Sequence, residues 1–130
     1  MLGKPDFGSV DQLVAPTIAM RNSPFFPRGI QGLERIKRLI ANVRSMISDL
    51  WVRVDDMVAE SDKVALHWTS GGTQSGQWDE GIPPTGKHVI RSGLDIYRLE
   101  GRMIVELDEV EDGLSLLHQV NALQTWKPDG

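Results

Sequence analysis

The sequence predicts an α+β domain in which helices pack on one face of a curved, mainly antiparallel sheet. Three observations support this class. Apolar residues recur every three or four positions between residues 33 and 47, which is the period of an amphipathic helix. After Asp49 the period changes to two, as in strands whose side chains alternate between two faces. Short polar connections separate neighbouring strands, so we expect antiparallel hairpins.

Length and composition limit the possible functions. The chain has 130 residues, enough for a single domain (1–130) with one core. Its 14 basic and 18 acidic residues leave a net charge of −4, which argues against nucleic-acid and membrane partners. The absence of cysteine excludes disulfides, thiolate catalysis and cysteine-ligated zinc. With no long apolar stretch and no signal-peptide pattern, we expect a cytoplasmic protein.

Two helices separated by an irregular segment are expected before the strands. A short helix is predicted over residues 9–16, where Ser9 can cap the first turn and Pro16 ends the element. Two prolines within residues 17–29 indicate a loop or an irregular strand. The next helix is the most regular element of the sequence, with an apolar stripe formed by Leu33, Ile36, Leu39, Ile40, Val43, Met46 and Ile47.

Four strands and a short helix follow. The expected strands span residues 50–60, 63–69, 87–99 and 103–110, with tight turns at residues 61–62 and 100–102. Asp112 can cap the last helix. The apolar residues of that helix are Leu114, Leu116, Leu117, Val120 and Leu123. We expect the tail at residues 125–130 to fray.

The motifs that are present favour acid–base chemistry by carboxylates and histidine. His67, His88 and His118 lie far apart and form no ligand pair of a known metal motif, so no metal site is expected. The glycine-rich run at residues 71–76 matches neither a dinucleotide fingerprint nor a phosphate-binding loop, and we interpret it as a bend in a strand. No GxSxG sequence is present, which excludes an α/β-hydrolase serine.

From residue 58 onward the sequence resembles the SnoaL-like polyketide cyclase and ester cyclase family. The segments that carry the resemblance are residues 58–65, 81–87 (GIPPTGK), 92–98 (SGLDIYR) and 104–106. The resemblance implies the cone-shaped α+β barrel that ketosteroid isomerase and nuclear transport factor 2 share, assembled as dimers or tetramers. It also implies that the N-terminal helix, which covers the mouth of the cone in relatives, is shortened here or replaced by another subunit.

The family also implies a type of chemistry. Its members close rings, isomerise or hydrate small hydrophobic substrates without a metal or an organic cofactor. We therefore expect a cofactor-free acid–base enzyme that cyclises or isomerises a hydrophobic polyketide or terpenoid intermediate. An epoxide-hydrolase-like reaction, a ketosteroid-isomerase-like proton shuttle and a non-catalytic small-molecule-binding domain remain open alternatives, because one fold serves several functions.

The resemblance assigns the candidate site residues. The catalytic aspartate of the cyclases falls at Glu109, its upstream partner falls at Asp95, and His67 stands where many relatives have arginine. We expect Glu109 and Asp95 to form an acid–base pair whose proton His67 orients or shares. The expected substrate-binding residues are Thr69, Trp78, Tyr97, Arg91 and Leu107, and no metal ligand is expected.

Strand alternation leaves two interpretations of the sheet faces. By pattern alone, the apolar face is the core and the polar face meets solvent. The resemblance implies the reverse, with His67 and Thr69 lining the cone beside Asp95. The outer face would then carry an apolar patch too large for a soluble monomer, made of Val64, Leu66, Trp68, Ile90, Leu94 and Ile96. We therefore expect a homodimer that packs through the convex face of the sheet.

Overall fold

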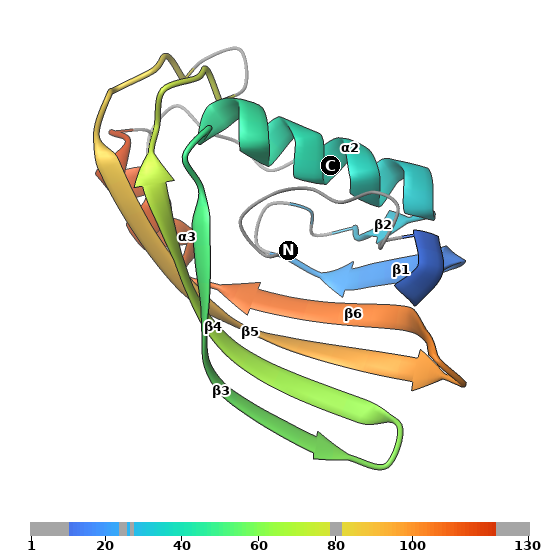
Figure 1. The fold of residues 1–130 in the computed structure, drawn as a ribbon. Coiled ribbons are helices and arrows are strands. Elements are labelled where there is room, and N and C mark those ends of the chain that lie inside the picture. The colour runs from blue at the N-terminus through green and yellow to red at the C-terminus, as the bar shows by residue number, and fades with distance from the viewer. Residues whose placement is uncertain (1–10, 24–25, 27, 79–81, 122–130) are drawn as a thin grey trace.

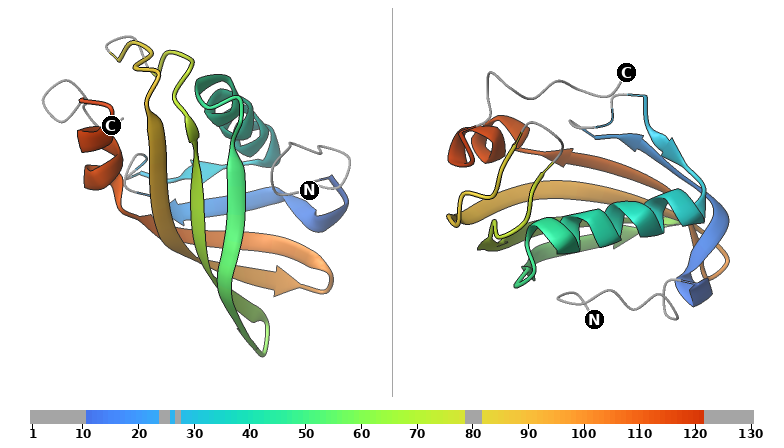
Figure 2. Two further views of the ribbon diagram at one scale, coloured as in Figure 1. Left: turned by 60° about the vertical axis from the view of Figure 1, so that its left-hand side comes forward. Right: turned by 90° about the horizontal axis from the view of Figure 1, so that it is seen from above.

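The computed structural model describes residues 11–23, 26, 28–78 and 82–121 and confirms the α+β class. A strongly curved, open sheet of six strands has the order β2-β1-β6-β5-β4-β3 (Figure 1). Helix α2 (Leu33–Met46) lies across the concave side of the sheet, and α3 (Gly113–Gln119) lies at one end of it (Figure 2). The two helices thus leave most of the convex face uncovered.

The sheet is a meander to which the N-terminal strand is added. The strands are β1 (Val14–Asn22), β2 (Ile30–Gln31), β3 (Trp51–Glu60), β4 (Lys63–Thr73), β5 (His88–Glu100) and β6 (Met103–Glu111). Strands β3 to β6 pair antiparallel, as predicted. The turn at residues 61–62 joins β3 to β4, and the turn predicted at 100–102 occupies residues 101–102 between β5 and β6. Strand β1 pairs parallel with β6 and antiparallel with β2.

The prediction of a helix over residues 9–16 is wrong for residues 14–16, whereas the irregular strand predicted as one alternative for residues 17–29 is confirmed for residues 17–22. Residues 11–13 are helical, but β1 begins at Val14 and includes Pro16. The pairing of β1 with β6 is irregular between Val14 and Ala19, which accommodates a proline that has no N–H to donate. The expected shortened N-terminal helix and the expected frayed tail involve residues 1–10 and 125–130, which lie outside the described part.

Helix α2 confirms the predicted apolar stripe. It begins after Gly32, whose φ of 99° lies in the region that favours glycine. Leu33 and Ile36 are buried and join a core cluster with residues from β1, β2 and β6. The stripe therefore covers the half of the concave face that β1 and β6 form.

A second core cluster joins α3 and the C-terminal end of α2 to β5. It contains Met46, Ile47, Ile82, Val89, Leu116, Leu117 and Val120. Beside it, the fully buried Gln74 side chain accepts hydrogen bonds from the backbone N–H and hydroxyl of Thr85 at 2.8 and 2.6 Å. The same side chain donates to the carbonyl of Pro83 at 3.2 Å. The described part of the GIPPTGK segment is thus held in place by Gln74.

The glycine-rich run extends β4 instead of forming a ligand loop. Gly72 has a φ of 153°, and a Cβ there would lie 2.3 Å from Cγ2 of Ile47. The glycine therefore permits close packing of β4 against the segment that follows α2. Helix α3 begins as predicted, because the Asp112 side chain accepts a hydrogen bond from the N–H of Ser115 at 2.9 Å.

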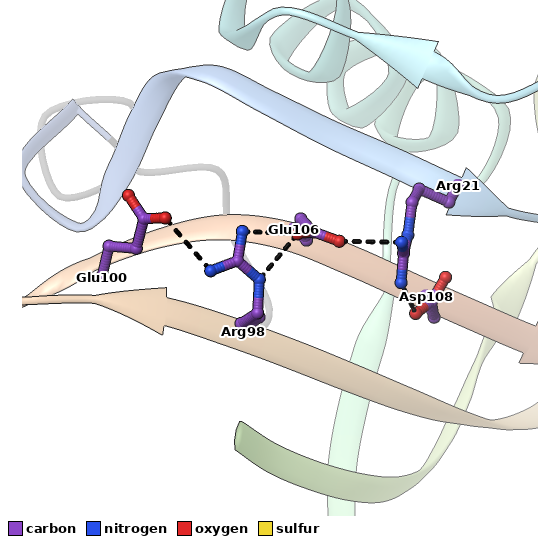
Figure 3. Close-up of polar contacts among 5 residues, drawn as sticks. All are labelled: Arg21, Arg98, Glu100, Glu106 and Asp108. Atoms are coloured by element: carbon purple, nitrogen blue, oxygen red, sulfur yellow. Dashed lines mark hydrogen bonds and ion pairs between the residues drawn. The ribbon is translucent and has the colours of Figure 1, made fainter. Parts of the chain in front are cut away.

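Ion pairs tie three strands together on the convex face (Figure 3). Arg21 of β1 pairs with Glu106 and Asp108 of β6 at 3.0 and 2.8 Å. Arg98 of β5 contacts Glu106 and also pairs with Glu100 at 3.1 Å. Surface pairs of this kind each contribute at most about 1 kcal/mol, so their main effect is to favour the register of β1 against β6.

The helices in the described part of the chain are too short or too polar to span a membrane.

Candidate functional site: a buried carboxyl cluster

Three carboxyl groups meet on the concave face where β5 and β6 pair. Asp95 of β5 lies directly opposite Glu109 of β6, and Glu111 lies opposite Gly93. Residues that face each other across an antiparallel pair share one side of the sheet. Asp95 is 7% exposed, and the Glu111 side chain is 3% exposed. The three groups therefore lie close together, with Asp95 and the Glu111 side chain removed from water and Glu109 half-buried.

The alternation of β5 places these residues inward. Val89 and Asp95 are buried, whereas Ile90, Leu94 and Ile96 are exposed. Arg91 and Tyr97 belong to the inward row with Asp95, which is the orientation that the sequence resemblance implied for β5. The polar face of this strand is thus its buried face.

Two neutral donors hold the Asp95 carboxyl group. The indole Nε1–H of Trp68 donates to Oδ1 at 3.0 Å, and the Tyr97 hydroxyl donates to Oδ2 at 2.9 Å. Burial raises the pKa of Asp95, and the two hydrogen bonds partly oppose that rise. Burial and the adjacent Asp95 charge raise the pKa of Tyr97, so this hydroxyl keeps its proton at neutral pH.

Glu109 lies between two other carboxyl groups. Burial, followed by the negative charges of Glu111 and Asp95, raises its pKa to about 8. Burial also raises the pKa of Glu111, against the opposing charge of Arg91. Glu109 shares hydrogen bonds with both neighbouring carboxyl groups. Glu109 therefore keeps its proton at neutral pH, unlike an exposed glutamate.

Arg91 supplies the positive charge of the cluster. Its Nη1 lies 3.3 Å from Oε2 of Glu111, and its Cζ lies 5.4 Å from the centroid of the Trp68 ring. The Arg91 side chain is 16% exposed. Arg91 thus lies over the ring whose Nε1–H donates to Asp95, which links the cation to the carboxyl groups.

Gly93 makes this arrangement possible. A Cβ at Gly93 would lie 2.5 Å from Cζ2 of Trp68, closer than real Cβ contacts. Because Gly93 has no side chain, the Trp68 indole can lie against Gly93 and reach Asp95, two residues further along β5. On the next pair along β5, Leu107 of β6 lies opposite Tyr97 and belongs to the core under α2. The carboxyl cluster therefore borders an apolar wall, as small-molecule sites commonly do.

The similarity to known proteins extends over nearly the whole chain. The sequence model of the SnoaL-like polyketide cyclase family matches residues 2–120. The chain belongs to this family. No curated protein shows significant similarity to it.

Several solved structures share the fold. TsrD from Streptomyces laurentii is 28% identical, with a TM-score of 0.78 over 91% of this chain and 84% of that one. IdmH from Streptomyces antibioticus is 24% identical, with a TM-score of 0.75 over 89% and 87% of the two chains. A SnoaL-like polyketide cyclase from Agrobacterium tumefaciens is 18% identical, with a TM-score of 0.70 over 88% and 84%.

Two positions inferred from the SnoaL-like family do not reach this cluster. His67 lies opposite Leu94 and is exposed, and the hydroxyl of Thr69 donates to Asp55 on the outer side of β3. The predicted faces of β4 are therefore wrong. The register aligns Leu66 with Asp95, so it is the apolar row of β4 that faces inward, and the buried Trp68 belongs to that row.

Trp78 also lies apart from the carboxyl cluster. It packs against the second core cluster, and its backbone N–H donates to the carbonyl of Ile82 at 2.9 Å. Of the residues that the family resemblance singled out, the structure brings together Glu109, Asp95, Tyr97, Arg91 and Leu107.

Sequence reasoning missed two residues of the cluster. Glu111 lies two positions after Glu109, so strand alternation alone would have placed it on the same face. Trp68 gave no such signal, because its inward orientation depends on the pairing of β4 with β5.

Two surface hollows, of about 490 and 410 Å³, lie away from the carboxyl cluster. The first lies beside the turn at residues 61–62, and the second is lined by Arg21, Arg28 and Arg35. Within the described ranges, no group of three or more histidine or acidic side chains is placed to hold a metal ion.

Proposed function

We propose that this SnoaL-like protein is a cofactor-free acid–base enzyme that closes a ring within a hydrophobic polyketide intermediate. The observation that carries the proposal is the pair of Asp95, which is buried, and Glu109, which is half-buried, lying directly opposite each other in different environments. Asp95 accepts hydrogen bonds from two neutral donors, whereas Glu109 lies among negative charges. Environments that separate the protonation of two neighbouring carboxyl groups are typical of acid–base pairs.

The two carboxyl groups take complementary roles. The Asp95 carboxylate removes a proton from the carbon next to a substrate carbonyl group, and the resulting enolate attacks a second carbonyl carbon of the same molecule. Glu109 donates its proton to the oxygen of that second carbonyl group as the carbon–carbon bond forms. The hydrogen bond between the two residues then returns the proton from Asp95 to Glu109, which restores the starting state.

Tyr97 is placed to orient Asp95. A ketosteroid-isomerase-like reaction would use a tyrosine hydroxyl to donate to the substrate oxyanion. Here the Tyr97 hydroxyl donates to Oδ2 of Asp95 at 2.9 Å, so it stabilises the charged base. This contact favours intramolecular ring closure with Glu109 as the acid.

The test compares turnover of variants that remove one titratable group each. The substrates are uncyclised aromatic polyketide intermediates, with terpenoid intermediates as a second set, and product isomers are separated by chromatography. We expect Asp95→Asn and Glu109→Gln to lose about 10²-fold or more in turnover, because proton transfer contributes about that much. Glu106→Gln changes the same strand on its opposite face and should keep full turnover. Variants that retain more than about a tenth of the activity would refute the acid–base pair.

We also propose that the protein forms a homodimer through the convex face of the sheet. The convex face carries exposed apolar side chains that α2 and α3 do not cover, 45–63% exposed: Val58, Ile90, Leu94, Ile96 and Val110. Contiguous apolar patches on soluble monomers rarely exceed a few hundred Å². The patch differs from the one expected from the sequence, because Val64, Leu66 and Trp68 face inward.

A further inference from the structure

One donor of the carboxyl cluster has no role in the mechanism above. The Nε atom of Arg91 is buried and has no hydrogen-bond partner among the residues that the structure describes. Buried polar groups are nearly always hydrogen-bonded, and an unmade bond costs about 1–3 kcal/mol. An acceptor that arrives with the substrate would remove this cost.

The Arg91 guanidinium is held in one orientation. Its Nη1 pairs with Glu111 at 3.3 Å, and its Cζ lies 5.4 Å from the Trp68 ring centroid. Trp68 is itself held by its hydrogen bond to Asp95. Because Nε belongs to the same planar group as Nη1, these contacts also determine where the Nε–H points. Such a donor is preorganised for an acceptor oxygen.

The charge of the cluster limits the ligand. Asp95, Glu109 and Glu111 place three carboxyl groups beside the single positive charge of Arg91, and Glu111 already pairs with that charge at 3.3 Å. A ligand carboxylate would add a further negative charge in a buried environment, where like charges repel strongly. An uncharged carbonyl oxygen can accept from Nε without this penalty.

We propose that Arg91 Nε binds a carbonyl oxygen of an uncharged substrate and that Glu111 is the positioning residue that orients the guanidinium. The inference rests on the proposed function, because the carbonyl oxygen lies on the substrate that Asp95 and Glu109 convert. It adds a substrate class: a neutral ketone or ester is accepted next to the cluster, and a free carboxylic acid is rejected.

The experiment measures binding, without turnover. The probes are chrysazin, an uncharged dihydroxyanthraquinone, and rhein, the same ring system with one added carboxyl group. Dissociation constants are obtained from tryptophan fluorescence near neutral pH. We expect chrysazin to bind at least about tenfold more tightly than rhein. Arg91→Lys should weaken chrysazin binding about tenfold or more, since hydrogen bonds to charged groups contribute about 1.5–3 kcal/mol.

Matched variants separate positioning from folding. Glu111→Gln should weaken chrysazin binding and reduce the discrimination against rhein, because it removes one negative charge and loosens the guanidinium. Arg98→Lys changes an ion-paired arginine on the convex side of the same strand and should leave both dissociation constants unchanged. In NMR spectra of the arginine Nε–Hε groups, the Arg91 resonance is the one that is missing from the spectrum of Arg91→Lys. Chrysazin should shift this resonance in the wild-type protein.

Three results would overturn the inference: unchanged chrysazin binding in Arg91→Lys, equal or tighter binding of rhein, or no binding of either probe. Failure of this inference and failure of the proposed function give different results. If Glu109→Gln lost turnover but Arg91→Lys bound chrysazin normally, only the carbonyl anchor would fail. If chrysazin bound as expected but Glu109→Gln kept full turnover, the acid–base pair would fail instead.

Discussion

Replacing Glu109 by glutamine should make the stability of the protein less dependent on pH. Burial, together with the charges of Glu111 and Asp95, raises the pKa of Glu109 from its ordinary value of 4.5 to about 8. Each pH unit of this displacement corresponds to about 1.4 kcal/mol. Ionising Glu109 in the folded protein therefore costs up to roughly 5 kcal/mol relative to the unfolded chain.

The sign follows from the protons bound in each state. Below about pH 4.5 both states hold the Glu109 proton, and its stabilising effect is complete. Between about pH 4.5 and 8 the unfolded chain has released this proton and the folded protein still holds it. The free energy of unfolding therefore falls by up to about 1.4 kcal/mol per pH unit. Above about pH 8 both states are ionised and the fall ends.

Glutamine has no proton to release, so this fall should disappear in Glu109→Gln. We expect the variant to lie within about 1 kcal/mol of wild type near the acidic end of the window. Near its alkaline end the variant should be more stable by about 2–5 kcal/mol. Urea unfolding followed by tryptophan fluorescence at several pH values measures both curves. The Glu106→Gln control should parallel wild type throughout. Parallel curves for wild type and Glu109→Gln would show that the Glu109 carboxyl group is solvated, and the reasoning would fail.

Three further changes test the surroundings of the cluster. Gly93→Ala should destabilise the protein by about 1–3 kcal/mol in urea unfolding, because its Cβ would overlap Trp68; an unchanged midpoint would contradict the close packing. Trp68→Phe should raise the pKa of Asp95, because it removes one hydrogen bond to the carboxylate. NMR titration of the carboxyl group measures this pKa, and an unchanged value would show that the hydrogen bond does not stabilise the carboxylate. Leu94→Lys and Ile96→Lys should each convert a dimer into a monomer in light scattering, whereas a wild-type monomer would remove the proposed interface.

Much of the secondary structure could be predicted because it depends on local pattern. The apolar stripe of α2, the hairpin turns and the Asp112 cap each follow from residues close together in the sequence. Strand β1 could not be predicted in the same way. Its Pro16 opposes regular pairing, and the strand exists because it pairs with β6, about ninety residues later. Contacts at this separation leave no periodic signal near β1.

The sequence by itself determined the α+β class, the two faces of each strand and the acid–base character of the candidate residues. Alternation shows which residues share a face, but it does not show which face is concave or how one strand is aligned with the next. The pairing of Leu66 with Asp95 decided that His67 points outward and Trp68 inward. The tertiary structure alone placed Asp95, Glu109 and Glu111 beside one arginine and shielded them partly or fully from water, and the raised pKa of Glu109 follows from that burial and those charges.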